Sequence, residues 1–335
     1  MNDRFNLPPL ARRLLWPVLT LGVLLLFNLF FTPGFFRVVV QNGYLYGSLI
    51  DVLKQAAPVA LMSIGMSLVI ATGGVDLSVG AIAAIAGTVA VRVLTSGHPS
   101  FGLAVTAALV LSLVLGAGNG LLVSGFGVQP IVATLILMVA GRGVAQLLSE
   151  GQILTVENDS FSFLALGHFL ALPTPVSIVV IMYVLTAVLM RTTALGLYVE
   201  AVGDNVVASR YAGLQVRGVQ GFVYAFSGLC AGVAGLIISS DIKAADANNA
   251  GLYTELDAIL AVVIGGGNLA GGRFSLAGSF VGALTIQTLV TTILTKGVPV
   301  QYTLVVKAVV VIVVCLLQAP AFRQLFAPRR APAAS

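Results

Sequence analysis

Asp76 is the residue of this chain best placed to do chemistry, because it is an acidic group between two long apolar runs. It lies in the sequence GGVDLS, residues 73–78. A carboxylate in apolar surroundings is costly and therefore a functional candidate, and at the start of a helix it accepts hydrogen bonds from free amides. We expect Asp76 to cap the next helix and to fix an interruption at a pathway or gate. The same group includes Gly73, Gly74 and Ser78.

Other polar side chains interrupt the apolar runs and could line a route for a polar molecule. We assign Asn119, Gln129 and Gln287 to such a route, with hydrogen bonding between helices as the alternative. Arg142 lies inside another apolar run and needs a carboxylate, carbonyl or water partner. Lys307 lies about two turns into the last apolar run, from which its long side chain could reach the interface.

No catalytic set is present. The chain lacks His-x-x-x-His, Gly-x-Ser-x-Gly and Cys-x-x-Cys, so we expect no enzyme activity, no metal site and no cofactor. The run GGGNLAGG, residues 265–272, lacks a lysine, and no Gly-Lys-Ser/Thr occurs, so the chain should not hydrolyse ATP itself. We interpret this run as a helix break with close helix approach. Its glycines are Gly265, Gly266, Gly267, Gly271 and Gly272.

The composition predicts that these groups lie in a membrane protein. Of 335 residues, 58% are apolar and 9% are charged, against about 25% charged in soluble domains. The net charge of +5 comes from scattered residues in short loops and tails, which excludes a nucleic-acid surface. The fold class is therefore an all-α polytopic membrane protein.

We count about ten apolar segments, each near the roughly 20 residues that cross a bilayer. The eighth is short and should stop partway or bend. Lys and Arg are more frequent on the side that holds both ends, which places both termini in the cytoplasm. The predicted segments are 14–31, 53–71, 77–95, 101–124, 129–148, 174–191, 219–239, 256–267, 274–295 and 300–318. These form one transmembrane domain, 14–318, between cytoplasmic tails 1–13 and 319–335.

The loop 192–218 is the longest on the predicted cytoplasmic side. Asp204 or Asn205 can cap a helix of about two turns, which Gly213 would end. A short helix outside the membrane is a rigid handle for a partner, although an interfacial helix without a partner would have the same pattern. The predicted partner contacts are Glu200, Gly203, Asp204, Asn205, Arg210 and Gly213.

The two glycine-rich interruptions lie in similar surroundings. Residues 68–84 and 262–283 both read as an apolar run, a glycine cluster and a helix of small residues. Interrupted helices at matching places in two halves are typical of duplicated transporters with a central site. We expect an internal repeat, with chance likeness between glycine-rich spans as the alternative.

At these motifs the chain resembles a known family. The run GMSLVIATGGVDLSVGAIAAIAG (65–87) resembles the signature of ribose-type permeases, the membrane subunits of bacterial ATP-binding-cassette (ABC) sugar importers. The resemblance continues through 129–147, 200–214, 241–251 and 255–274. Within the family, APVALMSIGM, AGRGVAQL and ADANNAG most resemble the permeases of galactofuranose importers.

The resemblance implies a permease of the bacterial inner membrane that carries a monosaccharide such as galactofuranose or ribose by alternating access. It implies cytoplasmic ATPase subunits that use ATP and bind the loop 200–214. It also implies a periplasmic sugar-binding protein and a second permease, either a copy or a different chain. Membrane lipid surrounds the spans.

Two other functions stay open. An ABC permease for branched-chain amino acids or nucleosides belongs to the same superfamily. An ion-coupled secondary transporter would need acidic residues inside the membrane, and the spans offer only Asp76.

Overall fold

The computed structural model describes residues 9–41, 43–97, 99–169 and 171–318. The predicted tail 319–335 and most of the tail 1–13 lie outside the described residues. Apolar runs of the predicted lengths form helices, which confirms the all-α membrane class. The described helices are α1 (Pro9–Phe31), α2 (Ser48–Ala71), α3 (Val79–Leu94), α4 (Phe101–Gly120), α5 (Pro130–Leu148), α6 (Asp159–Leu166), α7 (Thr174–Thr192), α8 (Leu195–Asp204), α9 (Val206–Tyr211), α10 (Val216–Asp241), α11 (Thr254–Ile264), α12 (Leu276–Thr295) and α13 (Val300–Gln318).

Seven of the described helices are long and apolar enough to cross a membrane. The fourth of the ten predicted segments continues from α4 into a π-helical turn, η1 (Leu121–Gly125). The remaining three segments correspond to α3, α11 and α13. At 1.5 Å per residue, α11 is about 16 Å long, roughly half of a bilayer core. The predicted short eighth segment is therefore confirmed as a half-span.

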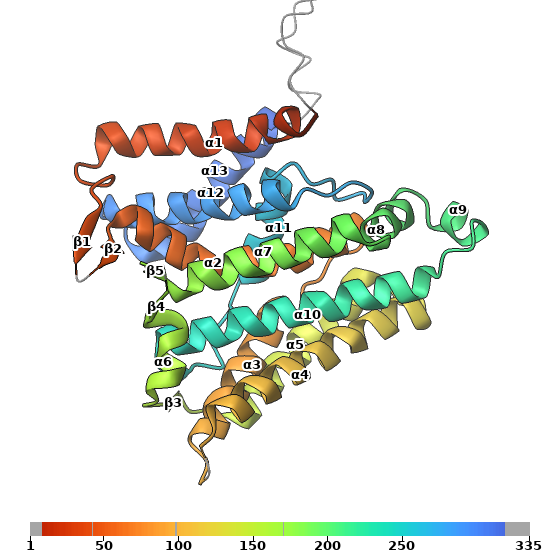
Figure 1. The fold of residues 1–335 in the computed structure, drawn as a ribbon, viewed down its shortest axis with the longest axis horizontal. Helices are drawn as coiled ribbons and strands as arrows, with labels where there is room; N and C mark the ends of the chain where they lie inside the picture. The colour runs from red at the N-terminus through yellow and green to blue at the C-terminus, as the bar shows by residue number, and fades with distance from the viewer. Residues whose placement is uncertain (1–8, 42, 98, 170, 319–335) are drawn as a thin grey trace, which may run out of the picture.

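Short strands close the end of the bundle opposite α8 and α9 (Figure 1). They form three two-stranded antiparallel pairs. The first and third are local hairpins, whereas the second joins distant parts of the chain. The pairs are β1 (Val39–Gln41) with β2 (Tyr44–Tyr46), β3 (Leu154–Thr155) with β6 (Ala244–Ala245), and β4 (His168–Phe169) with β5 (Leu172–Pro173).

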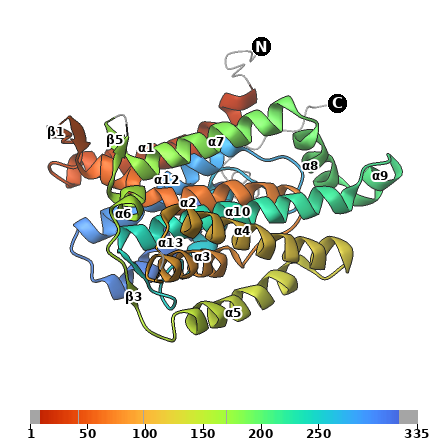
Figure 2. The same cartoon turned by 60° about the horizontal axis from the view of Figure 1, so that its bottom comes forward.

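The helices pack around α2, α3 and α10, and α2 is the most enclosed of the seven long spans. The apolar window of α2 is 78% buried, whereas that of α1 is only 11% buried. Small residues permit the closest approach: a Cβ on Gly116 of α4 would crowd the Gly228 backbone of α10. Figure 2 shows α2, α4 and α10 side by side and α5 at the edge. The same helices therefore hold the interruption between α2 and α3 in place.

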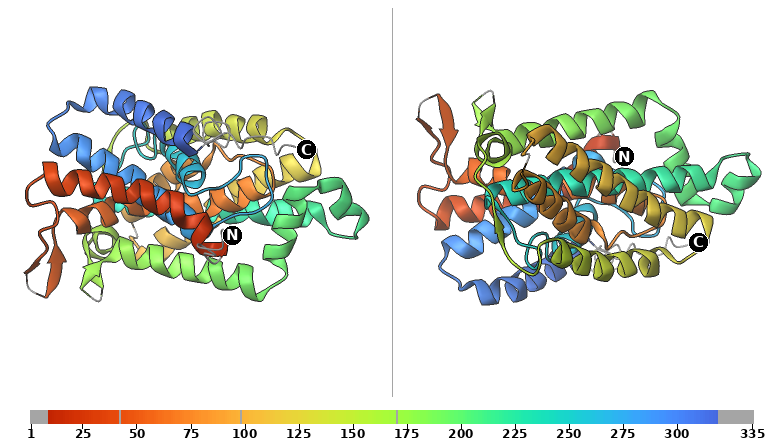
Figure 3. Two further views of the ribbon diagram at one scale, coloured as in Figure 1. Left: turned by 90° about the horizontal axis from the view of Figure 1, so that it is seen from above. Right: turned by 90° about the horizontal axis from the view of Figure 1, so that it is seen from below.

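The coupling segment, residues 193–215 between α7 and α10, lies at one end of the molecule. Figure 3 shows α9 at this end in views from above and below, with the hairpin β1–β2 at the other end. Helix α1 starts, and α13 ends, away from that hairpin (Figure 1). The two ends of the transmembrane domain thus point toward the side of the coupling segment.

Candidate coupling and pathway site

The first interruption lies between α2 and α3, as the glycine pair predicts. Gly73 has φ +79°, a conformation that side chains other than glycine rarely adopt. A Cβ on Gly74 would collide with the hydroxyl of Tyr224 on α10. The backbone therefore leaves the α2 helix at a position where only glycines permit both the turn and the contact with α10.

Asp76 is fully buried in this interruption, where its carboxylate joins three segments. Its Oδ1 accepts hydrogen bonds from the Ser78 amide at 3.0 Å and the Ser78 hydroxyl at 2.6 Å, and its Oδ2 accepts one from the Ser227 hydroxyl at 2.8 Å. The Asn119 amide of α4 donates to the Ser78 oxygen at 2.8 Å. Asp76, Ser78 and Asn119 thus form one network, which also includes Ser227, a residue that was not predicted. The assignment of Asp76, Ser78 and Asn119 to a pathway or gate stays a prediction.

The helix cap differs in detail from the prediction. Ser78, not Asp76, is the N-cap residue of α3, and Asp76 supports it from two positions earlier. The network fixes where α3 starts relative to α4 and α10. Buried hydrogen bonds of this kind hold membrane helices together at about 0.6 kcal/mol each on average. Asp76 therefore has at least a structural role.

Gln129 and Gln287 do not join this network. Gln129 is an exposed residue immediately before α5. The Gln287 side chain of α12 donates to Gln55 of α2 at 2.9 Å, away from Asp76. Their assignment to a pathway stays a prediction that the hydrogen bonds of the described residues do not support.

The coupling segment contains two helices where the sequence predicts one. Asn205 is the N-cap of α9, because its Oδ1 accepts from the Ala208 amide at 2.9 Å, and Gly213 follows the helix with φ +85°. Asp204 is instead the last residue of α8, a helix that the sequence analysis missed. The Ser209 hydroxyl donates to the Ala201 carbonyl at 2.8 Å, which ties α9 to α8. The coupling segment is thus a pair of helices, α8 and α9, that are joined by a hydrogen bond.

Gly203 of α8 contacts both interruptions at once. A Cβ at this position would collide with the Ala71 carbonyl oxygen and the Gly272 amide. The Gly272 amide itself donates to the Ala71 carbonyl at 2.9 Å. A Cβ on Gly271 would meet the Gly203 carbonyl and the Gly73 backbone. The end of α2, the second interruption and the coupling segment therefore meet at one point.

The second interruption runs from the end of α11 at Ile264 to the start of α12 at Leu276. All five predicted break glycines lie in it, which confirms the prediction. A Cβ on Gly265 would collide with the Gly278 backbone, so the first turn of α12 packs directly against the end of α11. In Figure 1 the loop between them extends toward α8. This placement brings it to Gly203.

Charged groups gather around the first turn of α11, where the Glu255 carboxylate lies against Gly80 near the start of α3. Arg142 of α5 donates to the carbonyls of Ala247 and Ala250, which confirms the expected carbonyl partners. Lys307 does not reach the interface: its ammonium lies 2.6 Å from Asp257 in a mostly buried ion pair. Glu255 and Asp257 lie in the first turn of α11. Asp76 is therefore not the only acidic group within the bundle.

The loop 242–253 is held to α5 by these polar contacts. The Gln146 amide donates to Asn248 at 2.7 Å, and Asp246 accepts from the side chain of Asn249 at 2.8 Å. Partial burial raises the pKa of Asp246, but hydrogen bonds from Asn249 and Asn248 outweigh it and bring the pKa below its ordinary value. This loop runs from the end of α10 past Gly251, which packs against Gly80 near the start of α3.

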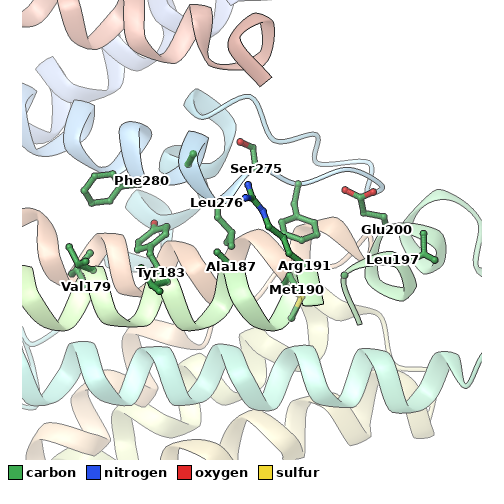
Figure 4. Close-up of a pocket in the computed structure, with 15 residues that line it drawn as sticks. Val179, Tyr183, Ala187, Met190, Arg191, Leu197, Glu200, Ser275, Leu276 and Phe280 are labelled. Atoms are coloured by element: carbon green, nitrogen blue, oxygen red, sulfur yellow. The ribbon is translucent and has the colours of Figure 1, made fainter. Parts of the chain in front are cut away.

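A groove of about 670 Å³ lies between α7 and α12 and ends at α8. Figure 4 shows Tyr183 and Phe280 within it, and Arg191 and Glu200 toward the α8 end. Glu200 was predicted to contact a partner protein. The groove itself could not be predicted, because its walls come from helices about 90 residues apart. No three His, Cys, Asp or Glu side chains of the described chain lie close enough to share a metal ion.

The matching family model and the most similar relatives agree on one protein family. Residues 48–315 match the model described as branched-chain amino acid transport system/permease component. The galactofuranose transporter permease protein YtfT of Escherichia coli is 51% identical, over 94% of this chain and 93% of that protein. The fructose import permease protein FruF of Bifidobacterium longum is 40% identical, over 95% and 91%.

The ribose import permease protein RbsC of Escherichia coli is 36% identical, over 85% of this chain and 87% of that protein. No solved structure matches the chain. The family model covers most of the chain, and these relatives align with it from near one end to the other. The chain therefore belongs to this family of transport-system permease components, and it is similar to the family's import permeases for sugars.

Proposed function

We propose that this chain is the membrane-spanning permease subunit of an ABC importer for a monosaccharide. The observation that carries the proposal is the contact of Gly203 with both interrupted helices. A protein that binds α8 and α9 can move the ends of α2 and α12 without touching the membrane interior. Packed helices with two discrete arrangements convert such a movement into opening or closing.

The coupling segment has the surface that a cytoplasmic ATPase would need. Tyr211 and Val207 of α9 are 90% and 62% exposed. Exposed apolar residues on a short rigid helix outside the spans are typical of a protein contact. Arg210 lies between them in sequence. We assign ATP hydrolysis to that partner, because this chain has no phosphate-binding loop of its own.

The proposed orientation places the coupling segment and both termini in the cytoplasm of a bacterium. The excess of Lys and Arg on that side supports it. The ordered loop 242–253 and the short strands would then face the periplasm and receive a sugar-binding protein. The exposed apolar face of α5 suits a second permease, either a copy or a different chain, and its exposed residues include Ile131, Leu135 and Val139.

The proposed cargo is a neutral monosaccharide, and galactofuranose is the first candidate. The name and 51% identity of YtfT support it, and ribose and fructose follow from the other relatives. Sugar hydroxyls need several weak hydrogen bonds and no fixed counter-ion. Of the charged groups described above, Arg142 is bound to carbonyls and Lys307 is paired with Asp257, which fits such a cargo.

Uptake with a panel of cargoes tests this proposal. The permease is reconstituted in vesicles with the ATPase, any second permease and the binding protein encoded beside it, and labelled galactofuranose, ribose, fructose and leucine are offered. We expect ATP-dependent uptake of one sugar and none of leucine. Leucine uptake would support an amino-acid permease instead. Uptake driven by a proton or sodium gradient without ATP would support the ion-coupled alternative.

A further inference from the structure

The groove between α7 and α12 has the length and lining of a lipid site. Its walls are mainly apolar and include Val179, Val184, Ala187, Leu197, Leu276 and Phe280. Val179 and Arg191 are separated by about 18 Å along α7, at 1.5 Å per residue. One leaflet of the bilayer core is roughly 15 Å deep. The groove therefore extends through about one leaflet, with its charged end where lipid headgroups lie.

The charged end of the groove carries one group of each sign. Arg191 lies in the last turn of α7, and Glu200 projects from α8 toward the same end of the groove (Figure 4). Neither side chain has an ion-pair partner within the described part of the chain. A guanidinium binds phosphate oxygens well, and a carboxylate binds a primary ammonium. The pair is complementary to a headgroup that carries both a phosphate and an ammonium.

We propose that this groove binds one phospholipid with an ethanolamine-type headgroup from the leaflet on the α8 side. Arg191 binds its phosphate, Glu200 binds its ammonium, and an acyl chain lies along α7 against Ala187 and Phe280. Such a lipid bridges α7, α8 and α12. It would thus link the coupling segment to a span next to the second interruption. The site does not depend on which cargo the protein carries.

Native mass spectrometry of the purified full-length protein tests this proposal. Phospholipids with ethanolamine, choline and glycerol headgroups and identical acyl chains are titrated separately. We expect one ethanolamine lipid to bind in preference to the other two. Arg191→Gln should weaken binding of all three about fivefold. Glu200→Gln should remove the preference for ethanolamine while binding itself persists.

Two matched controls separate this site from general lipid contact. Arg217→Gln removes an exposed arginine near the same side, at the start of α10, and should bind lipid as the unmodified protein does. Ala187→Phe fills the groove and should abolish the specific lipid, whereas Val188→Phe places the same ring at the next position, which does not line the groove.

Equal lipid retention by Arg191→Gln and Arg217→Gln would overturn the proposal. This comparison does not depend on whether Ala187→Phe folds. An independent experiment replaces Ala187 with a photo-crosslinking residue and identifies what becomes attached to it in the assembled transporter. We expect attachment to phospholipid. Attachment to a second permease or to the ATPase would instead identify the groove as a protein interface.

Discussion

The carbonyl oxygen of Ala71 accepts a hydrogen bond from the amide of Gly272 at 2.9 Å. These residues are about 200 positions apart, at the end of α2 and in the interruption before α12. Gly203 of the coupling segment packs on both partners of this bond. A movement of α8 therefore reaches the two interrupted helices through direct contacts, without an intervening side chain.

Gly203→Ala should reduce ATP-dependent uptake strongly while the protein still inserts. The added methyl group collides with backbone atoms of Ala71 and Gly272, and overpacking of this kind costs about 1–3 kcal/mol. Alanine is otherwise the better helix former by about 1 kcal/mol. Loss of uptake would thus report the contact and not a weaker α8. Uptake per inserted protein in vesicles is the measurement.

The matched control is Gly218→Ala in the first turn of α10, on the same side of the molecule. A Cβ there meets only the Gln215 side chain at ordinary contact distance. Its uptake should equal that of the unmodified protein. Equal uptake by Gly203→Ala would remove Gly203 from the coupling route.

Asn205→Ala should uncouple ATP hydrolysis from uptake, because α9 loses its cap. A lost cap costs about 1 kcal/mol, which is large for a helix of six residues. Asn205→Ser keeps a side-chain oxygen that can accept from the Ala208 amide and should behave normally. ATPase rate and uptake are measured on the same vesicles. If serine and alanine variants lost the same fraction of uptake, capping would not be the cause.

Lys307→Met should destabilise the protein by about 3–5 kcal/mol, because it leaves the Asp257 carboxylate buried without a partner. The double variant Lys307→Met, Asp257→Leu should recover most of this loss. Lys54→Met breaks a more exposed pair with Asp241 and should cost about 0–1 kcal/mol. Thermal unfolding in detergent measures all three. A Lys307→Met variant as stable as the unmodified protein would show that the ion pair adds no stability.

Asp76→Leu should lower the amount of folded protein, because it removes the acceptor for Ser78 and Ser227. Each buried group left unpaired costs about 1–3 kcal/mol. Asp76→Asn keeps one oxygen for the Ser78 amide and should fold. Its uptake then reports any role of the charge in the pathway. Size-exclusion profiles give the folded fraction, and a normal profile for Asp76→Leu would show that the network is dispensable.

The sequence predicted the spans well because each is a long apolar run, and a run such as 174–191 has nearly the bounds of α7. It also predicted the cap at Asn205 and the break after Ile264, since these depend on neighbouring residues. Helix α8 was not predicted, because a helix of ten residues is too short to give a clear helical periodicity of apolar residues. The glycine cluster 265–272 predicted close helix approach but not which helices would meet.

The contacts that assemble the site depend on distant residues and could not be predicted from local pattern. Ser227 is 151 positions from Asp76, and no spacing rule links them. Lys307 was assigned to the interface because the position of Asp257 on α11 was unknown, and the two residues are 50 positions apart. Gly203 was assigned to a partner surface, which stays a prediction, and its contacts with Ala71 and Gly272 could not be predicted from local pattern.

The central claim is that a separate ATPase, bound at α8 and α9, powers transport by this protein. Accumulation of labelled sugar in sealed vesicles tests it most directly. The permease is reconstituted first without, and then with, the ATPase and the binding protein, each time with ATP on the side of the coupling segment. We predict no accumulation in the first case and concentration above the external level in the second. Accumulation by the permease without the ATPase would contradict the account.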